Sequence, residues 1–422
     1  MALRSNAPTV VKNGDAMSRS VLDSGIEVLS ERIPGVRSAA VGVWIRQGSV
    51  HESGADSGVS HMLEHMVFKG TERRSSVEIA VALESLGGSL DAYTSREHTS
   101  YQARVLDEHV PEALDVLSDL VIRPRIEESD LRLEREVVLE EIAQVEDTPD
   151  DLVFELHGEL LWNGHPYGRS ILGTNESVGC MTAQGLRELH RGRYTGANLV
   201  VAGAGNLEHD EFVSRVEGLF EDVEPGIRSG PAEPTPTTRS GVEQRSRESA
   251  QTHIVFGTGV PGHSHPDRYA LVLLSSALGS GMSSRLFQRV REELGLCYSV
   301  YTYQSFYGIS GVSGVYVGTR PGTAEQAAVA VREELQRVAA EGLSGAEVDQ
   351  IKSQVKGQVM ISLESTGARL HRLASFALND EDFVDLSALL DRIDAVTPDD
   401  IRRVAGDYFH PERQFELRLG PA

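Results

Sequence analysis

The sequence predicts an α+β fold in which two homologous domains each contain a mainly antiparallel sheet covered by helices. Two observations indicate this class. Short apolar or alternating segments recur in both halves of the chain, and helical patterns follow them. A stretch rich in Pro, Gly, Ser and Thr separates two halves of similar length. We therefore expect an N-terminal domain at residues 18–223, a linker at 224–249 and a C-terminal domain at 250–422.

The expected strands indicate α+β sheets faced by helices. In both halves the first strand leads through a glycine-containing loop into a helix, so the halves resemble diverged copies. In the second half this helix is expected at Tyr269–Leu278, and parallel βαβ units are less favoured. The expected strands are Val41–Arg46, Tyr101–Val105, Leu199–Ala202, His253–Phe256, Val312–Val317 and Phe415–Leu419.

Local capping signals define a further helix and the strand after it. Ser75 followed by Glu78 forms a capping box, and Gly87–Gly88 ends the helix without a Cβ penalty. The chain then continues extended, and we expect an edge strand at Ser89–Thr94. An exposed edge offers main-chain groups to a peptide that pairs as an added strand. An ordinary hairpin edge is the alternative.

Composition excludes several classes of protein. The chain has 422 residues, 40% of them hydrophobic, which is ample for real cores, but no apolar run of about 18 residues that would span a bilayer. The amino terminus lacks the apolar block of a secretory signal. Cys180 and Cys297 are too few for a disulfide framework, as is typical of a reducing compartment. We therefore expect a cytoplasmic protein with no membrane partner.

The formal net charge of −23 argues against a nucleic-acid partner, because polyphosphate binding needs basic patches. The net charge favours a cationic polypeptide as the ligand, since an enclosed acidic cavity concentrates positively charged molecules. The alternative is that the charge only keeps the protein soluble.

The segment His61-Met-Leu-Glu-His65 carries the strongest chemical signal in the chain. In a helix, positions i, i+3 and i+4 share one face, so His61, Glu64 and His65 point the same way. Two such imidazoles bind one Zn²⁺, and the carboxylate reaches water in the open coordination position. The order H-x-x-E-H is the inverzincin signature and predicts amide hydrolysis. The alternative is a surface helix with solvated histidines, so a third ligand is required.

A second helix, expected at residues 129–146, supplies two candidates for the third ligand. On a helical wheel starting at Leu133, the apolar residues span an arc of about 180°, and Glu134 and Glu141 fall mid-way, at about 100° and 80°. A buried carboxylate needs a cationic partner such as Zn²⁺. The two lie roughly 10.5 Å apart along the axis, so one binds the ion and the other supports it. Alternatively, both pair with buried arginines or cap backbone groups.

Seven segments spread over most of the chain form a specific combination. In the first half they are HMLEHMVFKGT at His61–Thr71, AYTSRE at Ala92–Glu97, EREVVLEEI at Glu134–Ile142 and HPYGRSILG at His165–Gly173. In the second half they are Gly281–Phe287, Arg291–Tyr298 and Ser362–Thr366. Together they resemble the inverzincin metallopeptidases of the pitrilysin and mitochondrial processing peptidase type, which implies a processing-peptidase-like metallohydrolase fold.

The resemblance also implies roles for residues of the first half. One Zn²⁺ per chain is expected to be bound by His61, His65 and Glu141, with Glu134 in a supporting role. Glu64 is expected to take a proton from the water that attacks the scissile carbonyl and to return it to the leaving amine.

In the second half, the resemblance assigns two residues to substrate holding near the scissile bond. Arg291 binds a carbonyl or carboxylate, and Tyr298 donates a hydrogen bond to a developing oxyanion. Without the resemblance, they are interpreted as a helix-surface Arg and a core Tyr.

We expect the substrate to lie extended along the edge strand, where main-chain hydrogen bonds tolerate varied side chains. Many relatives have Asn where this chain has Asp91, and an ionised Asp cannot donate the hydrogen bond of an Asn amide. The carboxylate of Asp91 favours substrates with cationic residues at the positions that lie near it. The expected substrate-binding residues are Leu90, Asp91, Ala92 and Tyr93.

The sequence thus predicts a zinc endopeptidase that cleaves peptides or unfolded precursor segments in an enclosed chamber. The two domains are half the content of the single-chain pitrilysin relatives, so we expect a homodimer or a heterodimer with a related chain. A non-catalytic peptide-binding or scaffold subunit is one alternative. Another is a lyase that shares the H-x-x-E-H helix but uses a Cys as third ligand, for which Cys180 has no suitable context.

Overall fold

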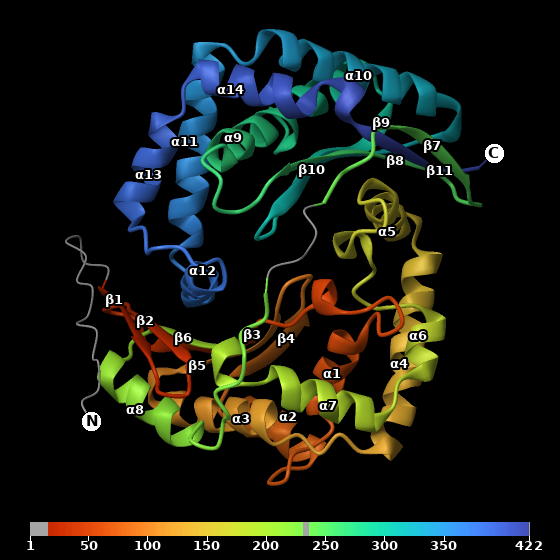
Figure 1. Ribbon diagram of the computed structural model, residues 1–422. Helices are drawn as coiled ribbons and strands as arrows, with labels where there is room; N and C mark the ends of the chain where they lie inside the picture. The colour runs from red at the N-terminus through yellow and green to blue at the C-terminus, as the bar shows by residue number, and fades with distance from the viewer. Residues whose placement is uncertain (1–15, 231–235, 422) are drawn as a thin grey trace. The chain divides into compact units, whose positions relative to one another are not determined.

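The computed structural model describes residues 16–230 and 236–421, which form two compact units (Figure 1). Unit 1 contains the described residues up to Ile142, with Ser170–Gly230 and Ile361–Asp385. Unit 2 contains Ala143–Arg169, the described part of 231–360, and the chain from Leu386 onward. Each unit therefore combines segments from both halves of the sequence. The stretch at 224–249, predicted as a linker, contributes to both units and contains a strand at Gly241–Ser246.

Unit 1 is built on a six-stranded sheet with the order β1-β2-β6-β3-β5-β4. Neighbouring strands pair antiparallel except β2 and β6, which are parallel. Strand β4 lies at one edge, as predicted. The strands are β1 (Ala16–Val21), β2 (Glu27–Arg32), β3 (Ser38–Ile45), β4 (Ser89–Thr94), β5 (Thr99–Leu106) and β6 (Leu199–Gly205).

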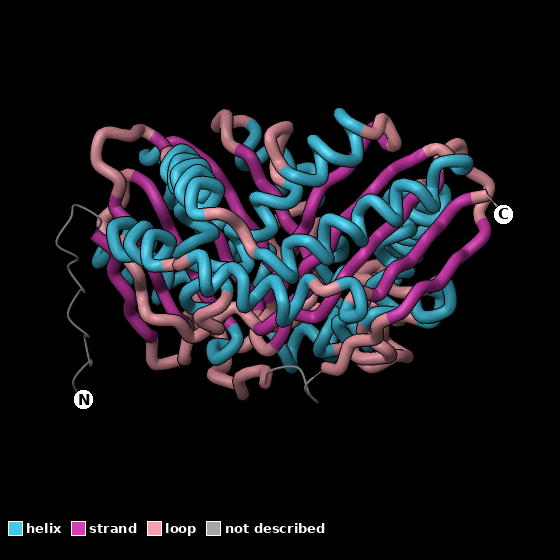
Figure 2. The backbone as a smooth tube through the Cα atoms, turned by 90° about the horizontal axis from the view of Figure 1, so that it is seen from above, coloured by secondary structure: helices cyan, strands magenta, loops and turns pink. Residues whose placement is uncertain are grey.

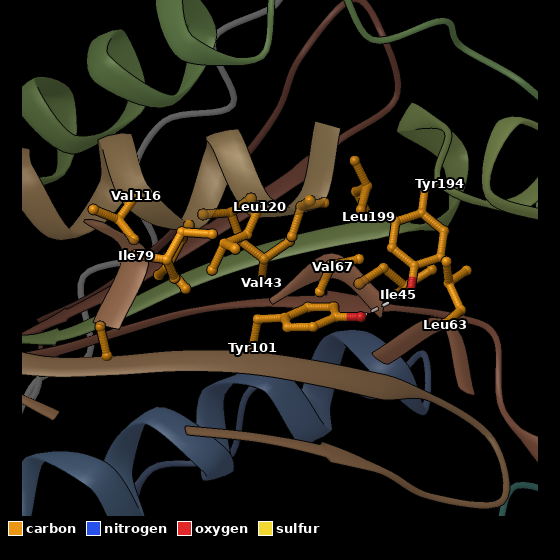
Figure 3. Packing of buried hydrophobic residues seen from close by; sticks show 14 of the residues in the cluster. Val43, Ile45, Leu63, Val67, Ile79, Tyr101, Val116, Leu120, Tyr194 and Leu199 are labelled. Carbon is orange, nitrogen blue, oxygen red and sulfur yellow. Dashed lines mark hydrogen bonds between the residues drawn. The ribbon is translucent and has the colours of Figure 1, made fainter. Parts of the chain in front are cut away.

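The central strands of this sheet are buried on both faces, which is why they consist of continuous apolar runs. In β3, Val43 faces the main core together with Tyr101 of β5, as Figure 3 shows. The next residue, Trp44, faces the opposite side and packs with Leu370 and Leu373 of helix α12. The helices are α1 (Val59–Val67), α2 (Ser76–Glu84), α3 (Val110–Ile122), α4 (Glu128–Asp147, ending in unit 2), α6 (Asn175–Cys180), α7 (Ala183–Arg193), α8 (His209–Leu219) and α12 (Thr366–Leu378).

Unit 2 repeats this arrangement on a five-stranded sheet with the order β7-β11-β8-β10-β9. Its parallel pair, β11 with β7, corresponds to β6 with β2, and β9 occupies the edge that β4 occupies in unit 1. The strands are β7 (Gly241–Ser246), β8 (Thr252–Pro261), β9 (Cys297–Phe306), β10 (Ser310–Thr319) and β11 (Phe415–Gly420). The α+β class predicted from the sequence is confirmed.

Helices also cover the sheet of unit 2, as the cyan and magenta segments of Figure 2 show. One face packs on the apolar side of α9, and on α5 the ring of Phe154 stacks on Tyr316 with centroids 5.5 Å apart. The helices are α5 (Pro149–Leu161), α9 (Arg268–Gly279), α10 (Ala324–Glu341), α11 (Gly345–Ser362), α13 (Leu386–Ala395), α14 (Pro398–Val404) and two π-helical segments, η5 (Phe287–Glu293) and η7 (Ala405–Phe409). None of the helices in the described ranges is long and apolar enough to cross a bilayer.

The strands expected from the sequence are present, with ends that differ by a few residues. The capping box is confirmed, because the Ser75 backbone N–H donates to Glu78 Oε2 at 2.7 Å and the Glu78 N–H to Ser75 Oγ at 3.3 Å. β1, β2, β7 and β9 were not expected. β7 is mostly exposed and polar, so it lacks the apolar alternation on which strand prediction depends.

Candidate metal centre

Helix α1 starts at a fixed point because an acidic side chain caps it. Gly58 precedes the helix with φ 88°, and a Cβ there would lie 2.5 Å from the Leu172 carbonyl oxygen. The Glu52 carboxylate accepts hydrogen bonds from the backbone N–H groups of Gly58 and Ser60, both at 2.8 Å. These contacts set where the first turn begins and thus which side chains face the core.

Helix α1 has an apolar face that is buried in the core and a polar face that is half-buried. Met62, Leu63, Met66 and Val67 are fully buried in the core of unit 1. The 3.6-residue period therefore leaves the polar side chains of the H-x-x-E-H segment half-buried on the remaining face.

His61, His65 and Glu141 come together, as the sequence predicts. The two imidazole rings have centroids 4.6 Å apart. His61 Nε2 lies 3.7 Å from Glu141 Oε2, and His65 Nε2 lies 3.6 Å from Glu141 Oε1. One ligand atom from each residue lies within 4.8 Å of the others. Cys180, the ligand in the lyase alternative, is not in this group.

These donors fit a zinc ion. Donor atoms around a tetrahedral Zn²⁺ with bonds of about 2 Å lie roughly 3.3 Å apart, close to the separations found here. Burial, and secondarily the charge of His65, lowers the pKa of His61 to about 4, so its ring is neutral and has a lone pair to share near neutral pH. Within the described ranges, His61 Nδ1 is buried and has no hydrogen-bond partner. Two imidazoles and a carboxylate are the ligand types of catalytic zinc.

Glu134, for which a supporting role is expected, contacts His65. It is 5% exposed, and its Oε2 accepts a hydrogen bond from His65 Nδ1 at 3.1 Å. Nδ1 is therefore the nitrogen of the His65 ring that binds Glu134, and Nε2 is the nitrogen that faces Glu141. Lys69 Nζ lies 2.5 Å from Glu134 Oε1 and compensates its charge. Lys69 was not predicted, and it lies two residues beyond the end of α1, where the helical period of the motif no longer identifies it.

The helical wheel for α4 correctly predicted that Glu134 is buried, but it was wrong for two apolar residues at the edge of the predicted buried face. Leu133 and Val137, placed on the buried arc, are 63% and 44% exposed. The buried residues of α4 are Leu131, Glu134, Val138 and Ile142, so the buried face is narrower than the apolar arc.

Glu64 lies on the same face of α1 and has a defined orientation. Thr94 Oγ1 donates a hydrogen bond to Glu64 Oε2 at 2.6 Å. The pKa of Glu64 is raised, mainly by burial. The Thr94 hydrogen bond and the charge of His65 act in the opposite direction, and the charge of Glu141 adds a smaller upward shift. A carboxyl group with a raised pKa is suited to accept and release a proton.

The predicted substrate strand alternates between two surroundings. Leu90 and Ala92 pack against the main core of unit 1. Asp91 is exposed, and the ring of Tyr93 lies 5.7 Å from His98 and 6.1 Å from His371, centroid to centroid. The main chain of β4 forms a sheet edge among the described strands.

Arg291 and Tyr298 lie together in unit 2, in a separate compact unit from the three metal-ligating candidates. The Arg291 guanidinium lies 4.6 Å from the ring centroid of Phe287 and 5.1 Å from that of Tyr298. Tyr298 is 77% exposed, so its interpretation as a core residue is wrong. It lines a pocket of about 640 Å³ whose wall also contains the acidic residues Asp147, Asp150, Asp151 and Glu248.

Two imidazoles and a carboxylate directed at one point, with a second carboxylate on the imidazole helix, define a zinc-peptidase type of centre on a duplicated α+β fold. The chain belongs to peptidase family M16. A family profile described as "Insulinase (Peptidase family M16)" matches residues 27–175, and one described as "Peptidase M16 inactive domain" matches residues 181–355. The family resemblance drawn from the sequence motifs is confirmed.

Relatives named as uncharacterized zinc proteases match nearly the whole chain. One from Streptomyces coelicolor is 40% identical over 400 residues, 92% of this chain and 86% of that protein. One from Bacillus subtilis is 38% identical over 394 residues, 93% of this chain and 96% of that protein.

Solved structures share the fold. A protease from Helicobacter pylori matches with a TM-score of 0.87 at 22% identity, over 96% of this chain and 100% of that chain. A Pseudomonas fluorescens structure described as a peptidase M16 inactive domain matches with a TM-score of 0.89 at 20% identity, over 96% and 98% of the two chains.

Proposed function

We propose that this chain is a zinc-dependent endopeptidase. The observation that carries the proposal is the approach of His61, His65 and Glu141 to within 4.8 Å of one another, with Glu64 one helical position from His65. Zn²⁺ bound by these three residues supplies a Lewis acid for the scissile carbonyl and lowers the pKa of a nearby water molecule. One ion per chain satisfies the donor set.

Glu64 performs the proton transfers of the reaction. Its Oε2 is occupied by the Thr94 hydroxyl, so Oε1 is the oxygen that takes the proton of the attacking water. The same oxygen then returns the proton to the leaving amine. Glu134 holds His65 by its Nδ1 proton and so keeps the imidazole in the orientation in which Nε2 points to Glu141.

The substrate is a peptide or an unfolded precursor segment bound in an extended conformation. It pairs with the edge strand β4 at Leu90, Asp91, Ala92 and Tyr93, where main-chain hydrogen bonds give affinity with little sequence preference. Arg291 and Tyr298 hold the substrate through its carbonyl oxygens. Four carboxylates in the Tyr298 pocket, together with exposed Asp91, support a preference for cationic residues.

A second chain, identical or related, completes the peptide-binding chamber in this proposal. Sedimentation of the purified chain, alone and with a related chain from the same source, measures which assembly forms.

A peptide-cleavage assay tests the proposed activity. The full chain, loaded with Zn²⁺, is incubated with a mixed peptide pool, and products are identified by mass spectrometry with and without a chelator. We expect cleavage that the chelator stops and added Zn²⁺ restores. A zinc-loaded, folded protein that binds peptides but cleaves none contradicts the proposal and favours the alternative of a non-catalytic peptide-binding or scaffold subunit.

A further inference from the structure

Glu64 has a single hydrogen-bonding partner within residues 16–230 and 236–421. Thr94 Oγ1 donates to Glu64 Oε2 at 2.6 Å, a short distance that is typical of a hydroxyl bound to an ionised carboxylate. No described side chain or backbone group bonds Glu64 Oε1. A glutamate side chain has three rotatable bonds and samples several rotamers when nothing holds it. The orientation of this carboxylate therefore depends on Thr94.

The Thr94 hydroxyl is carried by a rigid hairpin. Thr94 is the last residue of β4 and pairs with Thr99 of β5. Ser95 closes the turn, because its backbone N–H and its hydroxyl both donate to the His98 carbonyl oxygen at 2.8 Å. On the β5 side, Thr99 Oγ1 donates to the Gln47 carbonyl oxygen at 2.9 Å. The hydroxyl thus occupies a fixed position.

The turn of this hairpin is bound to the loop that leads toward α1. The Ser49 N–H donates to the Ser95 carbonyl at 3.3 Å, and the Val50 N–H donates to the Arg96 carbonyl at 2.8 Å. Gly48 permits this close approach, since a Cβ at Gly48 would lie 2.4 Å from the Ser95 carbonyl oxygen. The loop at Ser49 and Val50 therefore binds the hairpin and leads to α1. This connection places the Thr94 hydroxyl within hydrogen-bonding distance of the Glu64 carboxylate.

We propose that Thr94 is the positioning residue of the general base. By holding Glu64 Oε2, it directs Oε1 toward the attacking water and the leaving amine. The bond serves both states of the base, because a proton carried on Oε1 leaves Oε2 as an acceptor for the Thr94 hydroxyl. This inference rests on the proposed function, in which Glu64 moves the proton.

The position of Thr94 on β4 adds a second consequence. In the proposed function β4 also aligns the substrate, so one strand sets both the location of the scissile bond and the aim of the base. The orientation of the base and the position of the substrate then depend on the same strand. Such alignment is worth about 100-fold in rate for displacements near 1 Å.

Substitutions at Thr94 test the proposal. Thr94→Val keeps the shape and removes the donor, whereas Thr94→Ser keeps the donor. We expect Thr94→Val to lower kcat about 10- to 100-fold with KM and zinc content unchanged, and Thr94→Ser to restore most of the rate. Thr94→Ala, at a half-buried position on a sheet edge, serves if the Val variant does not fold.

Thr99→Val is the matched control. It removes a threonine hydroxyl from the same hairpin, but that hydroxyl bonds a backbone carbonyl and not Glu64. We expect it to lower thermal stability and to lower kcat much less than Thr94→Val does, because the Thr94 donor to Glu64 is retained. In a Glu64→Gln background, Thr94→Val should lower the residual rate no further, because Thr94 acts only through Glu64. A loss of the same size in both backgrounds overturns the proposal.

A readout without turnover separates this proposal from the proposed function. In crystals of the metal-free Thr94→Val protein, the Glu64 side chain should leave its present orientation while His61, His65 and Glu141 keep theirs. An unmoved Glu64 overturns the role of Thr94. If Thr94→Val is active with the same kcat as the unchanged chain, the role of Thr94 is also overturned, but the proposed peptidase activity stands. The peptidase proposal itself fails if the unchanged, zinc-loaded chain cleaves no peptide.

Discussion

The two units have one fold and different chemistry. Both sheets place their parallel pair at the same position and end in an edge strand, β4 in unit 1 and β9 in unit 2. In both, a helix follows the central strand in chain order, α1 after β3 and α9 after β8. Helix α1 carries two His and one Glu, whereas α9 has Arg268 as its one charged residue and otherwise mostly apolar residues. The apolar faces suffice for the fold, and chemistry depends on a few polar side chains added to one face.

The units also differ at the segment that precedes the edge strand. In unit 1, a capped α-helix, α2, leads to β4. In unit 2, the π-helical segment η5 leads to β9 and places Arg291 over the rings of Phe287 and Tyr298. π-helical turns often occur at functional sites. Among its described residues, unit 2 therefore has no counterpart of the His61, His65 and Glu141 group, and it has instead a cation over aromatic rings.

The largest expected effect comes from removing the proposed general base of unit 1. Glu64→Gln removes the proton acceptor but keeps the size of the side chain and the bond from Thr94. We expect kcat/KM to fall about 10²- to 10⁴-fold, the usual contribution of general acid–base catalysis, with zinc retained. Peptide cleavage and metal analysis measure the two quantities. Glu84→Gln, an exposed position on α2, is the control, and normal hydrolysis by Glu64→Gln would refute the assignment of the base.

The sequence predicted much of this centre because short-range periodicity determines it. The shared face of His61 and His65 follows from helix geometry alone. The wheel could not choose between Glu134 and Glu141, since they differ by about 20°, and the family resemblance made that choice. Which carboxylate meets the imidazoles depends on where α4 lies against α1, and local patterns do not contain that information.

Contacts between distant segments could not be predicted from the sequence either, because local patterns do not show which elements pack together. Helix α12 packs on the sheet of unit 1, although most of its sequence neighbours belong to unit 2, and α5 shows the reverse exchange. The amphipathic pattern of either helix identifies an apolar face but not the sheet that covers it. The hydrogen bond of Thr94 is similar, because a threonine at the end of an edge strand has no local signal that distinguishes it from other threonines.

A second prediction concerns metal affinity. Among the described residues, the group of three side chains that could hold a metal ion lies in unit 1. Glu134→Gln removes the charged acceptor of the His65 Nδ1 proton and the ion pair with Lys69. We expect zinc affinity to fall about 10- to 100-fold, the usual effect of removing such a support. Competition with a chromophoric chelator measures it. Glu136→Gln, exposed on the same helix, should leave the affinity unchanged, and equal affinities of the two variants would contradict the role of Glu134.

A third prediction tests whether unit 2 contributes to substrate binding. Arg291→Gln removes the charge stacked on Phe287 and Tyr298, and we expect kcat/KM to fall about 10-fold with zinc content unchanged. Arg289→Gln is the control, because Arg289 lies on the same segment and pairs with Glu293 at 2.9 Å. If both variants cleave peptides equally well, Arg291 has no role in holding the substrate.

The smallest expected effect concerns selectivity at the edge strand of unit 1. Asp91→Asn replaces an exposed carboxylate by an amide that also donates a hydrogen bond. Because an exposed charge is screened by water and salt, we expect the cleavage ratio of matched basic and acidic peptides to fall only about two- to fivefold. The change should shrink at high ionic strength, whereas Glu112→Gln, exposed on α3, should leave the ratio unaltered. An unchanged ratio in Asp91→Asn would mean that the main chain of β4, and not its charge, selects the substrate, and the preference for cationic residues would then depend on the acidic pocket of unit 2.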